Sequence, residues 1–153
     1  MKITVRKANL VDAKTIHSLI NTAASKGTVL PRSLSEIYES IRDFLVAEEN
    51  GKVTGCCSLH IAWEDLAEVR SLVVLPAQQK KGVGAKLLKS TLKEAKRMAL
   101  SKVFALTSQP EFFQKYGFER IGRKSLPHKI WGDCLKCPKF PKCDEVALWK
   151  KLS

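Results

Sequence analysis

Apolar and polar residues alternate at the start of the chain, and a helical periodicity soon replaces this alternation. Ile3–Arg6 alternates as a half-buried strand does. Asn9 has the form of a helix N-cap, and Gly27 ends the helix that follows it. Ser33–Glu36 resembles a capping box for a second helix near Leu34–Ile41. The stripe expected to bury the first helix consists of Ile16, Leu19, Ile20 and Ala23.

Three strands and a long helix are predicted next. Phe44–Glu48 and Val53–Ile61 are joined by Asn50-Gly51, a strong two-residue hairpin signal, and Glu68–Leu75 is the third strand. A helix is expected over Gly82–Leu100. Its buried face is predicted to contain Val83, Leu87, Leu88, Leu92, Ala95 and Ala99. Its solvent side is predicted to contain Lys86, Lys89, Lys93, Lys96 and Arg97.

The last third of the chain adds three strands and one short helix. Lys102–Thr107 is the first of these strands, and Pro110 then opens a short helix that Gly117 ends. Phe118–Ile121 and Glu145–Leu152 are the remaining strands. The predicted order is therefore β-α-α-β-β-β-α-β-α-β-β, a mixed α/β fold.

Chain length and hydropathy favour one domain away from membranes. A chain of 153 residues fits one core, so residues 1–153 are expected to form one domain, with an irregular segment rich in Pro, Lys and Cys at residues 124–144. No stretch approaches the roughly 20 apolar residues of a membrane span. Met1–Arg6 lacks the apolar core of a signal peptide. We therefore expect a cytoplasmic protein with no membrane partner.

The charge balance is strongly basic. Lys and Arg number 27 against 15 Asp and Glu, which gives a formal net charge of +12. Such a surface attracts anions, so nucleic acid, a polyphosphate cofactor and an acidic small substrate are all compatible with it. A solvated surface that aids solubility explains many of the lysines equally well. Charge alone does not choose among these interpretations.

The segment between the third strand and the long helix is the most informative. A strand enters a glycine-containing loop, and a helix N-terminus with free backbone N–H groups binds phosphate well. Gly82 and Gly84 let a pyrophosphate approach the backbone, and Lys80 and Lys81 add positive charge. The third glycine of a dinucleotide fingerprint and the Gly-Lys-Ser/Thr of a P-loop are both missing. An ordinary helix-initiating turn remains the alternative.

These residues resemble the GNAT family of N-acetyltransferases. Gln79–Gly84 matches the family's Gln/Arg-x-x-Gly-x-Gly/Ala pyrophosphate loop, and Phe112–Phe118 matches its late helix-to-strand signature. The resemblance implies the GNAT fold, a mostly antiparallel central sheet flanked by helices, and acetyl-CoA as co-substrate. Leu72–Val74 would pair its backbone with the pantetheine arm. The implied cofactor-binding residues are Leu72, Val73, Val74, Gln79, Lys80, Lys81, Gly82, Val83, Gly84 and Ala85.

A narrower resemblance covers nearly the whole chain. The sequence looks like the short, stand-alone form of N-acetylglutamate synthase, which implies acetyl transfer to the α-amine of glutamate at the start of arginine synthesis. Another amino acid, a peptide or a small amine remains an alternative acceptor, and a homodimer stays open. The segments that carry this resemblance are Leu30–Ser33, Ile41–Phe44, Leu66–Leu72, Phe104–Thr107 and Leu126–Trp131.

Candidate residues for the acceptor amine follow from the same resemblance. Glu68 stands where family members often carry an acid that deprotonates the amine. Strand alternation would put Glu68, Arg70 and Leu72 on one face, so Arg70 either binds a substrate carboxylate or holds Glu68 in place. Arg32, in the loop that covers the acceptor site, is expected to bind the substrate carboxylate. Arg42 and Lys129 are weaker candidates for a second carboxylate.

The proton donor for the leaving thiolate is open. Phe113 occupies the place where many family members have a tyrosine, and Tyr116 is expected to be a packing residue. Water, Thr107 or Ser108 could supply the proton.

Two histidines and two cysteines have ordinary interpretations. His17 is expected to be structural or exposed, and His60 could serve the cleft but also suits packing. Cys56 and Cys57 lie in an apolar run typical of small core residues.

The cysteine-rich tail has the spacing His-x5-Cys-x2-Cys-x5-Cys. His128, Cys134, Cys137 and Cys143 could provide four zinc ligands and give order to a segment with little apolar pattern. The thiols could equally be free, and His128 could face the active site. A zinc-carrying nucleic-acid-binding module is disfavoured because no face with interleaved aromatic and basic residues is apparent. A non-catalytic acetyl-CoA sensor remains the other alternative.

Overall fold

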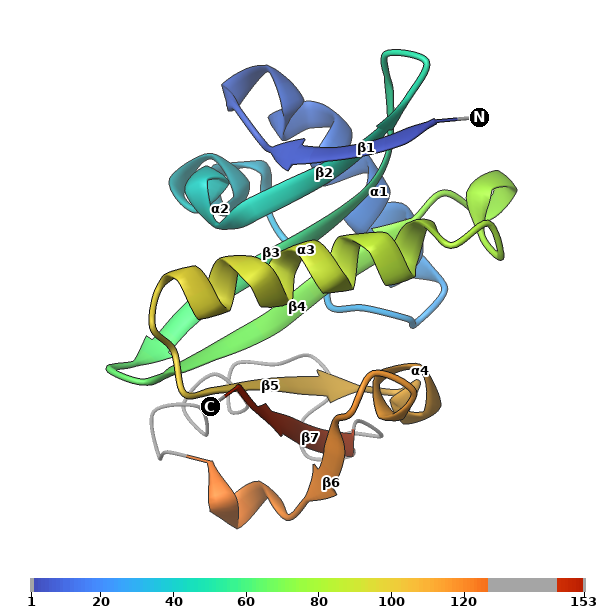
Figure 1. Cartoon of the computed structure of the whole chain (residues 1–153). Helices are drawn as coiled ribbons and strands as arrows, with labels where there is room; N and C mark the ends of the chain where they lie inside the picture. Colours follow the sequence, from blue (N-terminus) through green and yellow to red (C-terminus); the bar gives the residue numbers. More distant parts are fainter. Residues whose placement is uncertain (1, 127–145, 153) are drawn as a thin grey trace.

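A computed structural model describes residues 2–126 and 146–152 and contains one seven-stranded sheet in those ranges. Its strand order is β1-β2-β3-β4-β5-β7-β6 (Figure 1). The strands are β1 Ile3–Lys7, β2 Phe44–Glu49, β3 Lys52–Trp63, β4 Leu66–Val74, β5 Lys102–Thr107, β6 Glu119–Ile121 and β7 Val146–Lys151. The helices are η1 Leu10–Asp12, α1 Ala13–Ser25, α2 Leu34–Glu39, η2 Ile41–Asp43, η3 Pro76–Gln78, α3 Val83–Arg97, α4 Pro110–Gln114 and η4 Arg123–Ser125. The predicted element order is confirmed.

The local signals in the sequence produce the predicted caps and hairpin. Asn9 starts a capping box with Asp12, and Ser33 starts another with Glu36 at the N-terminus of α2. Between β2 and β3, Asn50 and Gly51 have φ values of 54° and 75°, as a type I′ turn requires. These short-range features set where the first three strands and two helices begin.

The first helix is tied to the first strand by an ion pair. Arg6 on β1 donates to both carboxylate oxygens of Asp12, at 2.8 and 2.9 Å, and also to Glu48 on β2. These bonds from the Arg6 guanidinium hold the pKa of Asp12 below its ordinary value. Arg6 thus joins the edge of the sheet to the start of the helical layer.

Helices cover both faces of the sheet (Figure 1). Helix α3 packs on one face through Val83, Leu87, Leu88 and Ala95, and these side chains belong to the largest buried cluster. Helices α1 and α2 pack on the opposite face, where Ile16, Ile20 and Ile37 are buried. The predicted burial of Ala99 is wrong: α3 ends at Arg97, and Ala99 follows it as an exposed residue with φ of 63°.

Strands β4 and β5 are a parallel pair among antiparallel neighbours, and they pair only briefly. The pairing joins Leu66–Glu68 to Lys102–Phe104. In the described part of the chain, β4 continues to Val74 without a partner strand on that side. Figure 1 shows the two strands separating toward the N-terminal end of α3. This edge of β4 can therefore pair with an extended ligand along Leu72–Val74.

A bulge in β4 changes which side chains face each helical layer. Ser71 has φ of 56°, and the register with β3 shifts here so that β4 contains one extra residue. The prediction that Leu72 shares a face with Glu68 and Arg70 is therefore wrong. Leu72 packs into the cluster on the α3 side, whereas Arg70 and Ser71 line a cavity on the α2 side.

Candidate active site

The loop from β4 to α3 presents backbone N–H groups at the opening between β4 and β5. Lys80 and Gly82 have positive φ values of 68° and 84°, and Gly82 caps α3 without a side-chain hydrogen bond. The first intrahelical bond of this end runs from the Lys86 N–H to the Gly82 carbonyl at 3.0 Å. The amides at residues 83–85 precede it and point out of the helix, where the helix dipole favours an anion. This is the geometry expected of a pyrophosphate site.

Neighbouring side chains fix this loop in place. Gln79 donates from Nε2 to the Val74 carbonyl at 3.1 Å, which closes the loop onto the strand. A Cβ atom on Gly84 would lie 3.6 Å from Phe112 and 3.8 Å from Val74, so β4, α3 and α4 approach one another closely at this glycine. The predicted cofactor residues from Leu72 to Ala85 thus form one continuous strand, loop and helix start.

The late helix supplies aromatic packing beside the loop. Phe112 contacts both Phe113 and Tyr116, with ring centroids 5.4 and 5.3 Å away. Phe113 is buried, and Tyr116 is half-buried against Phe112, as expected of a packing residue. The hydroxyl oxygen of Thr107 accepts the N–H of Gln109 at 2.9 Å.

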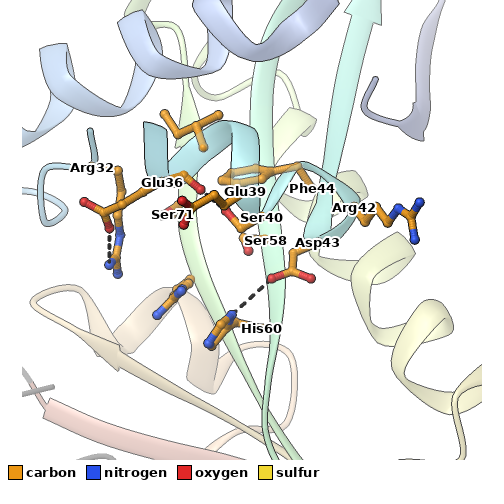
Figure 2. A pocket seen from close by; sticks show the side chains of 12 residues that line it. Arg32, Glu36, Glu39, Ser40, Arg42, Asp43, Phe44, Ser58, His60 and Ser71 are labelled. Carbon is orange, nitrogen blue, oxygen red and sulfur yellow. Dashed lines mark hydrogen bonds and ion pairs between the residues drawn. The ribbon is translucent and has the colours of Figure 1, made fainter. Parts of the chain in front are cut away.

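A cavity of about 480 Å³ lies on the other side of β4, beneath α2 and η2. A volume of this order suits a small metabolite. Charged side chains of both signs surround it (Figure 2). Its lining comprises Arg32, Glu36, Ile37, Glu39, Ser40, Arg42, Asp43, Phe44, Ser58, His60, Arg70 and Ser71. The cavity reaches the Ser71 bulge, close to where β4 leaves β5, so the two predicted ligand sites meet along one strand.

Arg32 is held at this cavity by its backbone and its side chain. The amide of Asn21 on α1 donates to the Arg32 carbonyl at 2.8 Å and accepts the Arg32 N–H at 3.3 Å. The same Asn21 amide donates to the His17 carbonyl at 2.9 Å. The guanidinium of Arg32 lies 3.6 Å from Glu36. Arg32 therefore enters the cavity wall from a loop that α1 anchors.

Glu68 and Arg70 lie together on the face of β4 that the cavity uses. Their side chains are 3.7 Å apart, with exposed fractions of 14% and 19%, so both are partly accessible from the cavity side. Among the described residues, the lining includes Arg70 but not Glu68 itself. The structure thus brings the predicted residues Arg32 and Arg70 to one cavity, and Glu68 lies directly beside that cavity.

His60 has a larger part in this cavity than its sequence position indicated. Its Nδ1 lies 3.0 Å from a carboxylate oxygen of Asp43, which comes from η2. In the sheet, His60 is also the direct cross-strand partner of Glu68. Strand alternation from Ser58 could have placed His60 on this face, but no sequence signal pairs it with Asp43.

The other candidates lie away from the cavity centre or outside the described residues. Arg42 is exposed and points away from His60 in Figure 2, although it lies at the rim. His17 is half-buried on α1. Cys56 and Cys57 are buried in the core as predicted, and burial raises the pKa of both thiols, that of Cys57 to about 12. Lys129 lies outside the described residues.

No zinc site can be placed from the described residues. Within residues 2–126 and 146–152, no group of three or more His, Cys, Asp or Glu side chains is arranged to hold a metal ion. The predicted ligands His128, Cys134, Cys137 and Cys143 all lie outside these ranges. The zinc site stays a prediction.

Relatives with these features are acetyltransferases. Residues 40–120 match the acetyltransferase (GNAT) domain family. An uncharacterized N-acetyltransferase of Chlorobaculum tepidum is 40% identical over 148 residues, which cover 97% of this chain and 96% of that protein. The chain belongs to the GNAT family. A second GNAT relative, the amino-acid acetyltransferase of Mycobacterium tuberculosis, is 39% identical over 120 residues, covering 76% of this chain and 68% of that protein.

Solved GNAT structures share the whole fold. N-acetylglutamate synthase from Neisseria gonorrhoeae, complexed with coenzyme A and N-acetyl-glutamate, superposes with a TM-score of 0.91 at 27% identity. The match covers 100% of this chain but only 36% of the Neisseria chain. A Mycobacterium tuberculosis protein in complex with CoA has a TM-score of 0.85 at 29% identity, with 98% and 99% of the two chains covered. The predicted GNAT fold is confirmed.

The protein is accordingly an acetyl-CoA-dependent N-acetyltransferase of the GNAT family. Family membership assigns the reaction class, and the exposed amides of the β4–α3 loop agree with a phosphorylated co-substrate. Among the described helices, none is both long and apolar enough to cross a bilayer.

Proposed function

We propose that this GNAT enzyme transfers the acetyl group of acetyl-CoA to the α-amine of L-glutamate, the reaction that begins arginine synthesis. The observation that carries the proposal is the convergence of Arg32 and Arg70 on one cavity beside Glu68. Guanidinium groups bind carboxylates with charge-assisted, often bidentate, hydrogen bonds. An acceptor with two carboxylates makes use of both arginines.

The surroundings of the two arginines support an amino acid over a polyamine. Arg32 comes from a loop that Asn21 anchors and Arg70 from strand β4, and both line the same cavity. Glu36 and Glu39 also line it, and they can receive the ammonium group of a zwitterion. A zwitterionic acid therefore complements the cavity better than a purely cationic amine.

Relatives give independent support for this acceptor. The Mycobacterium tuberculosis and Neisseria meningitidis relatives are both amino-acid acetyltransferases, and the Neisseria gonorrhoeae neighbour is an N-acetylglutamate synthase. The Neisseria proteins are much longer than this chain. The inference that this chain uses the same substrate is therefore part of the proposal.

The proposed reaction divides the work between the two sites. The strand and loop from Leu72 to Ala85 hold acetyl-CoA, with pantetheine along β4 and pyrophosphate at the start of α3. Glu68 relays the ammonium proton toward solvent, and the free amine attacks the thioester carbonyl. Arg32 and Arg70 hold the carboxylates so that the amine faces the opening between β4 and β5.

The first test measures release of free CoA thiol with and without L-glutamate. We expect glutamate-dependent release, and Arg32→Ala should raise KM for glutamate roughly 10- to 100-fold, because a hydrogen bond to a charged group contributes about 1.5–3 kcal/mol. Glu68→Gln should lower kcat. Arg97→Ala is the matched control, because Arg97 is an exposed arginine on the far end of α3.

The outcomes separate the acceptor from the reaction. Release with another amine but not with glutamate would keep the enzyme class and overturn the substrate. An unchanged KM for glutamate in the Arg32→Ala variant would remove Arg32 from the binding site.

A further inference from the structure

His60 and Asp43 both line the acceptor cavity, and the imidazole of His60 contacts the carboxylate of Asp43. His60 stands on β3 and Asp43 on η2, and Nδ1 lies 3.0 Å from Oδ2. The exposed fractions of the two side chains are 37% and 28%, so both remain accessible to a ligand. Figure 2 shows the two groups directed toward one another. Packing of η2 against β3 therefore fixes the orientation of the ring.

The position of His60 relative to β4 places it beside the proposed chemistry. His60 opposes Glu68 and Ser58 opposes Arg70 in the antiparallel pairing, so all four side chains share one face. Of these, His60, Ser58 and Arg70 line the cavity. The imidazole consequently borders the space that an acceptor amine would occupy, whereas Glu68 lies at its side.

We propose that His60 is the group that takes the proton from the acceptor ammonium, with Asp43 as its positioning residue. This assignment rests on the proposed function. With the Nδ1 hydrogen directed to Asp43, Nε2 keeps its lone pair for a proton from the ammonium, directly or through one water. An imidazole suits this task because it exchanges protons near neutral pH, and a carboxylate partner stabilises the imidazolium that forms.

The proton and bond balance is complete with the groups present. One ammonium proton passes to Nε2 of His60 and then to solvent. The nitrogen lone pair forms the N–C bond, and the C–S bond of the thioester breaks. The second nitrogen proton ends on the thiolate sulfur, so CoA leaves as the free thiol.

Several charged groups face His60 and shape any pH response. Asp43 faces it from η2, Glu68 and Arg70 from β4, and Arg32 and Glu36 line the same cavity from the neighbouring loop and α2. A pH profile alone therefore reports on the whole cluster, and the test compares variants at each pH.

The experiment measures kcat and both KM values from pH 6 to pH 10 for His60→Gln, Asp43→Asn and the double variant. At neutral pH we expect His60→Gln to lower kcat roughly 100-fold or more, the usual contribution of a general base. KM for both substrates should change much less. The loss of kcat relative to the wild type should become smaller as the pH rises, because the acceptor amine then loses its proton to solvent. His17→Gln is the matched control, a histidine on α1 outside the cavity lining.

Asp43 is tested by its dependence on His60. Asp43→Asn should lower kcat and show the same recovery at high pH. Because Asp43 acts through His60, the double variant should be no slower than His60→Gln alone. A thermal unfolding measurement checks that each variant is folded. Added imidazole should restore part of the activity of His60→Ala, which keeps the test valid if a polar replacement disturbs the cavity.

Three results with the variants would overturn the proposal. Retention of kcat within about threefold in His60→Gln, whatever the pH, would show that no proton passes through this ring. A raised KM for the acceptor with unchanged kcat would make His60 a carboxylate ligand. Additive losses of kcat in the double variant would show that Asp43 does not act through His60.

If the wild type acetylates another amine but not glutamate, the proposed substrate fails, and the variants are compared with that amine as the acceptor. If the wild type acetylates no amine, both proposals fail.

Discussion

At the scale of single residues, the most consequential contact lies outside the cavity. Arg32 is a loop residue, and a loop alone would let its guanidinium sample many positions. Asn21 prevents this by bonding both the N–H and the carbonyl of Arg32, as a neighbouring strand would. The carboxylate of Glu36, paired with the Arg32 guanidinium, then restricts the positions that the guanidinium can take. If Arg32 binds the substrate as proposed, Asn21 is a positioning residue for that binding.

Replacing Asn21 should weaken acceptor binding without touching the cavity. Asn21→Ala removes three hydrogen bonds and leaves the Arg32 backbone without its partners, so we expect a stability loss of about 1–3 kcal/mol. KM for glutamate should rise several-fold more than KM for acetyl-CoA. Steady-state kinetics and thermal unfolding measure both effects. Thr22→Ala, an exposed change on the same helix, is the control. Equal rises in the two KM values would indicate general destabilisation and contradict the positioning role.

At the scale of elements, the sequence predicted what local chemistry determines. The N-cap at Asn9, the capping box at Ser33 and the Asn50-Gly51 turn each depend on residues no more than three positions apart, and all of them form as predicted. The bulge at Ser71 has no such signature, because a serine within an apolar run is normal in a strand. Ala99 likewise occupies a left-handed position where glycine is usual. Both errors arise where the residue type gives no local signal for the backbone conformation that it adopts.

The same distinction explains the candidate site. The family resemblance named Arg32 and Arg70, and the fold brings both to one cavity: Arg70 through its place in β4 and Arg32 through a loop that Asn21 anchors. His60 and Asp43 are 17 residues apart, and their contact exists only because η2 packs on β3. A pairing of that kind is invisible to periodicity, which describes one element at a time.

The start of α3 gives a prediction that belongs to this element. Gly82 has φ of 84°, whereas Gly84 lies inside the helix with room for a methyl group at 3.6 Å from Phe112. Gly82→Ala should cost about 1–2 kcal/mol of folding stability, because an L side chain is strained in the left-handed region. It should also weaken CoA binding by disturbing the loop amides. Gly84→Ala should change stability by less than about 0.5 kcal/mol.

Thermal unfolding with and without CoA measures both parts of this prediction. Ligand binding to the native state raises the midpoint, and the increase should be smaller in Gly82→Ala than in the wild type. An undiminished CoA-induced increase in Gly82→Ala would show that the loop conformation is not needed for phosphate binding.

At the scale of the whole molecule, the proposed reaction brings both substrates to one strand. The face of β4 toward α2 borders the acceptor cavity, and its separation from β5 leaves backbone groups open to the donor. The bulge at Ser71 stands at the junction. One strand can serve both substrates because its two long sides and its faces are used separately: hydrogen-bonding edge for the donor, side-chain face for the acceptor.

The net charge of +12 gives a prediction for how the donor arrives. CoA carries several negative charges, and Lys80 and Lys81 lie at the exposed loop where its pyrophosphate is expected. Electrostatic attraction of this kind raises association rates and weakens with salt, since the Debye length falls from about 10 Å at 0.1 M to about 3 Å at 1 M. KM for acetyl-CoA should therefore rise with ionic strength, while kcat at saturation changes little.

Two double variants distinguish attraction of the donor by the loop lysines from attraction by the total charge of the protein. The double change Lys80→Gln and Lys81→Gln should raise KM for acetyl-CoA at low salt and flatten its salt dependence, because the nearest attractive charges are gone. Lys14→Gln with Lys26→Gln removes the same charge from α1 and its C-cap, on the opposite face of the sheet, and should leave the salt dependence close to that of the wild type. Identical slopes for both pairs would mean that the total charge, rather than the loop, attracts the donor. A flattened slope in the loop pair alone would locate the attraction at the site where the β4–α3 amides already favour phosphate.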